Sequence, residues 1–189
     1  MNASSRRLVY GSLALLGLLC ACGETHPDKL IQPARESLAK NQPQAAILQL
    51  TSLLQDSPDL SQARLLLGQA YLDSGDPAAA ETELRKAMAL GVPELAVMPL
   101  LARVLIAKGE AQTVIQQFAT VTLADPTAEA DLKTSLATAH GRNGAPQEAM
   151  AALNLALQSV PDYPPALLVK ARSMAEQRNL VDAARHRGN

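Results

Sequence analysis

The feature that most constrains this chain is a repeat of about 34 residues. The segment 66–72 reads LLGQAYL, and the segment 100–106, which begins 34 residues later, reads LLARVLI. A fixed period of this length is typical of stacked units, each of which buries its apolar face against the next. With Leu67 placed at position 7 of a unit, units begin after residues 26, 60, 94, 129 and 163.

Small and apolar residues recur at four positions of this frame. They are Ala34, Gly68, Ala102, Ala137 and Ala171 at position 8; Ala46, Ala80, Val114, Ala149 and Ala183 at position 20; Leu50, Leu84, Phe118 and Leu153 at position 24; and Leu53, Ala87, Val121 and Ala156 at position 27. Such residues let two antiparallel helices approach closely. We therefore expect one helix pair in each unit, with these side chains between its two helices.

Glycine, asparagine and proline mark the expected helix ends. Position 15 holds residues that adopt φ > 0 where a helix stops, and position 17 holds prolines suited to the first turn of the next helix. These residues are Asn41, Gly75, Gly109 and Gly144 at position 15, Pro43, Pro77 and Pro146 at position 17, and Pro58, Pro126 and Pro161 at position 32. Each unit is thus predicted as a helix, a stop, a Pro-started helix and a Pro-marked turn. Pro99, at position 5, is expected near a helix start, where its cost is small.

The composition favours helix and gives no sign of nucleic-acid binding. Ala, Leu and Gln lose little rotamer freedom in a helix, and no sustained alternation of β-branched and polar residues predicts a strand. The chain has 17 Lys+Arg against 18 Asp+Glu, with three Tyr, one Phe and no Trp. A nucleic-acid binder normally has a basic face with stacking aromatics, so nucleic acid is not an expected partner.

Taken together, these positions resemble the tetratricopeptide repeat, and residues 61–94 match it most closely. The matching residues there are Leu67, Gly68, Tyr71, Ala80, Leu84 and Ala87. The resemblance implies an all-α, right-handed solenoid of antiparallel helix pairs, with units at 27–60, 61–94, 95–128 and 130–163 and a partial unit at 164–189. The partial unit ends in the basic segment 185–189, which is either a polar cap or the end of a broken-off array.

The N-terminus has the build of an export signal. Arg6 and Arg7 precede an apolar run from Leu8 to Leu19, which is 12 residues long. A membrane span needs about 20 apolar residues, so a cleaved signal peptide over residues 1–21 fits better. A twin-arginine signal remains the alternative interpretation of the two arginines.

Cys20 and Cys22 end this apolar run. With one residue between them they are too close for an unstrained disulfide, and the three histidines are too scattered to complete a zinc site. The segment Leu19-Cys20-Ala21-Cys22 resembles a bacterial lipoprotein signal, in which a small residue precedes the obligatory cysteine. That resemblance implies lipid attachment at Cys22, a short linker over 22–26 and a place on the periplasmic face of the outer membrane. The alternative is an ordinary secretory signal with incidental cysteines.

No pattern in the sequence predicts catalysis. We find no nucleophile with a base, no paired carboxylates, no metal cluster and no phosphate loop, so we expect no enzyme, cofactor, metal or small-molecule substrate. His140 stands at position 11 and is expected to be a packed or half-exposed helix residue. Glu81, Glu83, Arg85 and Lys86 are expected to form a solvated helix face with i,i+4 pairs.

The resemblance to the tetratricopeptide repeat also implies a concave surface lined by positions 2, 5, 9, 12 and 13. The candidate binding residues there are Arg35, Gln62, Gln69, Asp73, Arg103, Asp131, Thr138 and Arg142. Their mixed charge favours a protein or peptide ligand held by polar contacts. The alternative is that they are merely exposed helix residues.

A closer resemblance rests on the segment 63–93, ARLLLGQAYLDSGDPAAAETELRKAMALGVP, followed by PLLARVLIAKGE and FATVTLADP. It is similar to the tetratricopeptide-repeat lipoproteins (PrsT-like) of the bacterial exosortase system, which accompany PEP-CTERM protein sorting and exopolysaccharide production. Members are longer, so the chain corresponds to their N-terminal portion and is expected to be a shortened product or fragment. This implies a non-enzymatic envelope adaptor. The alternatives are an assembly lipoprotein for type IV pili or outer-membrane proteins, and the regulatory repeat portion of a truncated larger enzyme.

Overall fold

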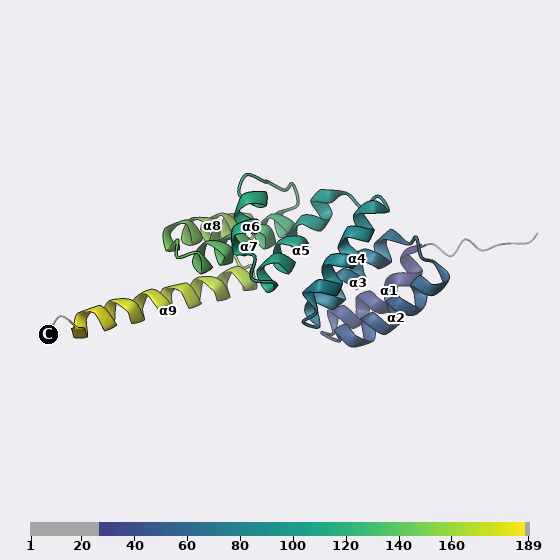
Figure 1. The fold of residues 1–189 in the computed structure, drawn as a ribbon, viewed down its shortest axis with the longest axis horizontal. Coiled ribbons are helices and arrows are strands. Elements are labelled where there is room, and N and C mark those ends of the chain that lie inside the picture. The colour runs from purple at the N-terminus through teal and green to yellow at the C-terminus, as the bar shows by residue number, and fades with distance from the viewer. Residues whose placement is uncertain (1–26, 188–189) are drawn as a thin grey trace, which may run out of the picture.

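The computed structural model describes residues 27–187, and the predicted signal peptide, linker and Cys22 lie outside these residues. All nine elements within them are helices, which confirms the predicted all-α class. In chain order they are α1 (Pro27–Ala39), α2 (Pro43–Asp56), α3 (Ser61–Asp73), α4 (Pro77–Ala89), α5 (Glu94–Ala107), α6 (Ala111–Phe118), α7 (Pro126–Arg142), α8 (Pro146–Ser159) and α9 (Pro164–Arg187). Figure 1 shows them as an elongated array with α9 projecting from one end.

The helices pack in sequential pairs, in the way of a tetratricopeptide-repeat array. Helices α1 and α2, α3 and α4, α5 and α6, and α7 and α8 are in contact, and each second helix also contacts the first helix of the next pair. The first helices contact one another along the array, from α1 to α3, α5, α7 and α9. Among the described helices, no second helix contacts the second helix of the next pair. The first helices are therefore closer together and form the inner side of the array.

The predicted stop residues adopt the left-handed conformation. The φ angles are 55° at Asn41, 88° at Gly75, 83° at Gly109 and 73° at Gly144. At Gly75 the turn is closed by backbone hydrogen bonds, with Gly75 N–H donating to the carbonyl of Leu72 and Asp76 N–H to that of Tyr71. Prolines begin α2, α4 and α8, as the spacing predicts.

The close approach of the two helices in a pair is clearest at Gly68 in α3. A Cβ atom added there would lie 2.7 Å from both Cγ and Cδ2 of Leu84 in α4, and 3.3 Å from the carbonyl oxygen of Ala80. Leu84 and Ala80 are both fully buried. The small residue at position 8 is therefore required by the packing of the helix at positions 20 and 24.

The third unit departs from the predicted pattern. Helix α6 has only eight residues, and Val121, expected between two helices, lies instead in the connection 119–125. Pro126, expected in a turn, is the first residue of α7. The reason is local: the side chain of Asp125 accepts a hydrogen bond from Ala128 N–H at 2.7 Å and caps α7, so this helix begins early.

Pro99 also lies deeper in its helix than expected. It is the sixth residue of α5 and is buried, so its missing N–H leaves the carbonyl of Leu95 without its helical donor. A proline beyond the first helical turn costs about 3 kcal/mol in an isolated helix. Packing of the apolar residues of α5 offsets this cost, since Val97, Ala102 and Val104 are fully buried.

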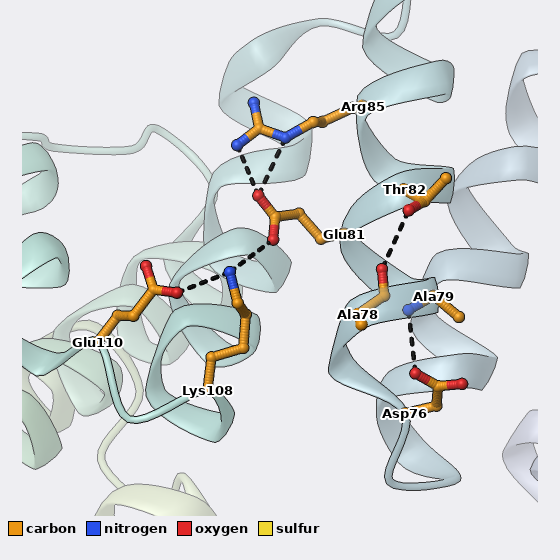
Figure 2. Close-up of polar contacts among 8 residues, drawn as sticks. All are labelled: Asp76, Ala78, Ala79, Glu81, Thr82, Arg85, Lys108 and Glu110. Atoms are coloured by element: carbon orange, nitrogen blue, oxygen red, sulfur yellow. Dashed lines mark hydrogen bonds and ion pairs between the residues drawn. The ribbon is translucent and has the colours of Figure 1, made fainter.

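Ion pairs hold the second helix pair together and join it to the third. As Figure 2 shows, one oxygen of Glu81 in α4 accepts from Arg85 at 2.6 Å, the other accepts from Lys108 at 2.9 Å, and Lys108 also contacts Glu110 at 2.6 Å. Hydrogen bonds from Lys108 and then Arg85 hold the pKa of Glu81 below its ordinary value. Glu83, expected on the solvated face, is instead 8% exposed and lies 2.8 Å from Arg64 of α3. The expectation of a wholly solvated helix face is therefore wrong, because the side chain of Glu83 is buried between its own helix, α4, and the neighbouring α3.

Helix α9 is a single helix of 24 residues that contacts α7 and α8. Along its first half the side chains of Leu167, Leu168 and Met174 are exposed. Over residues 27–187, none of the helices is both long and apolar enough to cross a membrane.

Candidate functional site

A cavity of about 670 Å³ lies on the inner side of the array. The first helices of three consecutive pairs supply most of its wall, because these helices contact one another directly. Its lining residues are Leu72 and Asp73 of α3; Arg103, Ile106 and Ala107 of α5; Asp131, Thr134, Ser135, Thr138 and Arg142 of α7; Tyr163; and Pro165 of α9.

Five of the eight candidate binding residues line this cavity. They are Asp73, Arg103, Asp131, Thr138 and Arg142. Arg35, Gln62 and Gln69 lie elsewhere, and Arg35 is an exposed residue of α1 that lies 3.8 Å from Asp28. Sequence reasoning missed Thr134, Ser135 and Tyr163, which complete the polar part of the wall.

Charged side chains from three helices interact at one end of the cavity. The Arg103 guanidinium donates to Asp73 at 2.9 Å, which ties α5 to α3. Arg103 also attracts Asp131 on α7, and the Tyr163 hydroxyl is hydrogen-bonded to Asp131. Two carboxylates thus share one guanidinium at this end of the cavity, which leaves a net charge of about −1 there.

Burial changes the pKa values of Asp131 and Tyr163. It raises the pKa of Asp131 above its ordinary value, and repulsion from Asp73 acts in the same direction, whereas Arg103 and Tyr163 oppose it. Burial and the neighbouring Asp131 raise the pKa of Tyr163 to about 12. Tyr163 therefore keeps its proton at neutral pH and donates it to Asp131.

Three hydroxyl groups continue the α7 wall beyond Asp131. Thr134 Oγ1 donates to the carbonyl of Ala130 at 2.6 Å, and Thr138 Oγ1 donates to that of Thr134 at 2.9 Å. Ser135 is 5% exposed and lines the cavity, and within the described structure its hydroxyl has no hydrogen-bond partner. This wall therefore presents oxygen lone pairs to the cavity.

Arg142 lies at the opposite end of the cavity. It is exposed at the last residue of α7 and donates to the carbonyl of Ile106 in α5. Eleven residues separate it from Asp131 along the helix, or about 16 Å at 1.5 Å per residue. The cavity thus has an acidic end at α3, α5 and the start of α9, and a basic end at the C-terminus of α7.

His140 does not belong to this cavity. It is half-buried on α7 and lines a separate hollow of about 240 Å³ together with Lys133 and Glu148. Within residues 27–187, no group of three or more His, Cys, Asp or Glu side chains is placed to hold a metal ion.

Comparison with known families identifies the repeat directly. Residues 37–93 match the tetratricopeptide repeat family. The matched segment runs from the end of α1 through α4 and includes the pair formed by α3 and α4, where Gly68 packs against Leu84. No curated protein matches the chain. The chain thus carries a tetratricopeptide repeat, a module that builds extended concave surfaces for protein–protein interaction.

Proposed function

We propose that this chain is a non-enzymatic adaptor that binds proteins or peptides on the inner side of its helical array. The observation that carries the proposal is the cavity of about 670 Å³ between α3, α5 and α7. It combines an apolar part, formed by Leu72 and Ile106, with polar groups from three successive repeats. Such a surface suits an extended peptide segment, which offers both side chains and unpaired backbone groups.

The adaptor is proposed to act in the bacterial envelope, tied to a membrane by lipid on Cys22. Support comes from the lipoprotein-like segment Leu19-Cys20-Ala21-Cys22 and the short apolar run before it. Each buried CH₂ of an attached acyl chain contributes about 0.8 kcal/mol, so several chains on one residue anchor a protein firmly. The residue after Cys22 is Gly23 and not aspartate, which by resemblance favours the periplasmic face of the outer membrane.

The pathway proposed for the adaptor is exosortase-linked sorting of PEP-CTERM proteins and production of exopolysaccharide. The support is the resemblance carried by the segment 63–93. Deletion of the gene in the producing bacterium is expected to leave PEP-CTERM proteins unsorted and to reduce exopolysaccharide. Normal sorting and exopolysaccharide after deletion would rule out this pathway.

Binding in the cavity is tested by filling it. Thr138→Tyr places a large side chain in the middle of the α7 wall, and Thr113→Tyr makes the same change at another half-buried threonine, in α6 and outside the cavity. Proteins that co-purify with the full chain from solubilised membranes are compared by quantitative mass spectrometry. We expect Thr138→Tyr to lose partners that Thr113→Tyr and wild type retain. An unchanged set of partners would refute binding in this cavity.

The anchor is tested by metabolic labelling with a fatty acid. Cys22→Ser removes the proposed thioether and is expected to abolish labelling, whereas Cys20→Ser is the matched control and is expected to keep it. Label that persists on the Cys22→Ser protein would rule out lipid attachment at Cys22.

A further inference from the structure

The α7 residues that line the cavity offer mainly hydrogen-bond acceptors, so they suit a ligand that donates hydrogen bonds. Asp131 offers carboxylate oxygens, which accept when ionised. The hydroxyl protons of Thr134 and Thr138 are already donated to backbone carbonyls of α7, at 2.6 and 2.9 Å, so only their lone pairs face outward. A ligand group that donates hydrogen bonds therefore suits Asp131, Thr134 and Thr138 along this wall.

Ser135 provides an independent indication of a ligand at the same place. Its side chain is 5% exposed and lines the cavity, and its hydroxyl has no partner among the residues that the structure describes. The hydroxyl oxygen itself is open to the cavity, since among the described residues every fully buried side-chain nitrogen or oxygen has a hydrogen-bond partner. A polar group that enters the cavity between Asp131 and Thr138 would meet this open hydroxyl.

The charge at this end of the cavity is unbalanced. Asp73 and Asp131 face a single cation, Arg103, whose closest contact is the 2.9 Å bond to Asp73. Arg142 lies about 16 Å farther along α7 and does not compensate Asp131. A second positive charge placed beside Asp131 would bring this end of the cavity to neutrality.

We propose that the cavity binds a lysine or arginine side chain of the partner protein, with its charged group against Asp131 and the hydroxyl of Ser135. An ammonium group has three donors and a guanidinium five, and neither has an acceptor, which matches the acceptor-rich wall. Leu72, Ile106 and Pro165 line the same cavity and suit the aliphatic stem of such a side chain. This inference rests on the proposed function, because it names the chemistry of the peptide bound at that site.

The experiment is selection from a degenerate library of heptapeptides with blocked ends. The full chain, purified in detergent and immobilised, is incubated with the library, and retained peptides are sequenced by mass spectrometry. Asp131→Asn removes the charge but keeps an oxygen that accepts from Tyr163. Asp59→Asn makes the same change at an exposed residue outside the cavity and serves as the control.

We expect lysine or arginine to be enriched at one position of the peptides retained by wild type and by Asp59→Asn. Asp131→Asn is expected to reduce that enrichment at least about tenfold, as for loss of one partner from a buried charge pair. Retained peptides without a basic preference, or with an acidic one, would overturn the inference and leave the proposed function standing. Enrichment that survives Asp131→Asn would also overturn it. If no peptide is retained, both proposals fail.

Discussion

The pair formed by α3 and α4 and the pair formed by α5 and α6 share one sequence frame but end differently. Both bury the residue at position 24, Leu84 in α4 and Phe118 in α6. Helix α4 continues beyond this residue to Ala89, whereas α6 stops at Phe118 itself and is followed by the irregular segment 119–125. The recurring small and apolar positions therefore determine how two helices pack, and other residues determine where each helix ends.

In the third unit, a buried ion pair holds the irregular segment in place. Glu129 accepts from the backbone N–H of Leu123 at 2.8 Å, and Lys133 donates to the carbonyl of Val121 at 2.6 Å. The two side chains lie 3.4 Å apart on α7, and the residues are 9% and 6% exposed. They bind backbone groups that a longer α6 would have paired internally. The difference between the two units is thus a replacement of helical hydrogen bonds by side-chain ones.

The largest expected effect is on the feature that the two units share. Phe118→Ala is expected to lower the free energy of unfolding by about 3–5 kcal/mol and Leu84→Ala by about 2–5 kcal/mol, because each leaves a buried cavity. Chemical denaturation of each variant measures the change. A loss below about 1 kcal/mol for Phe118→Ala would show that α6 is not packed as the frame requires.

The next largest effect is expected from the buried ion pair of the third unit, between Glu129 and Lys133. Lys133→Met leaves Glu129 buried without its cation and removes the bond to Val121, so we expect a loss of about 3 kcal/mol. Lys86→Met is the matched change in α4, where Lys86 is exposed and pairs with Glu83, and it should cost less than about 1 kcal/mol. Hydrogen exchange should accelerate at Leu123 in the first variant only. Equal costs for the two variants would contradict the distinction between the units.

A smaller effect tests the close approach within the second unit. Gly68→Ala is expected to destabilise the chain by about 1–3 kcal/mol, since the new methyl group would lie 2.7 Å from Leu84 atoms. Gly141→Ala, in the last turn of α7 with no atom within 4 Å of the added methyl group, should stabilise it by up to about 1 kcal/mol. The sign of the two changes in thermal midpoint is the measurement. The same sign for both would contradict the packing described for α3 and α4.

The smallest effect links packing to the cavity. The pKa of Asp131 is raised in the folded chain, chiefly by burial. Between the unfolded and folded pKa values, the folded state therefore holds a proton that the unfolded state has released. The contribution of protonated Asp131 to the free energy of unfolding is therefore fully present below the ordinary aspartate pKa. It is lost as the pH rises through the folded pKa. Asp131→Asn should raise the thermal midpoint at pH 7 but not at pH 3, whereas Asp59→Asn should change neither. No difference between the two variants at pH 7 would show that burial does not strain Asp131.

The helix pairs, their glycine stops and the close contact at Gly68 were predictable from the sequence, because each depends on one residue type at one position of the frame. The length of α6 was not, since it depends on Glu129 and Lys133, whose bonds to 119–125 appear only when α7 is folded. The candidate site was predicted only in part, because the position of Asp131 depends on where α7 begins. With α7 beginning at Pro126, Asp131 is its sixth residue and not near its start, which places it beside Tyr163, the residue just before α9.

The central claim is that partners bind in the cavity between α3, α5 and α7, and photo-crosslinking in cells tests it most directly. A photoreactive amino acid is placed at Thr138 in the cavity wall or at Leu48, which is 72% exposed on α2, and crosslinked partners are compared. We predict a discrete crosslinked protein from position 138, mapped to a segment that contains lysine or arginine, and none from position 48. Crosslinks that are equal at both positions, or absent at position 138, would contradict the account.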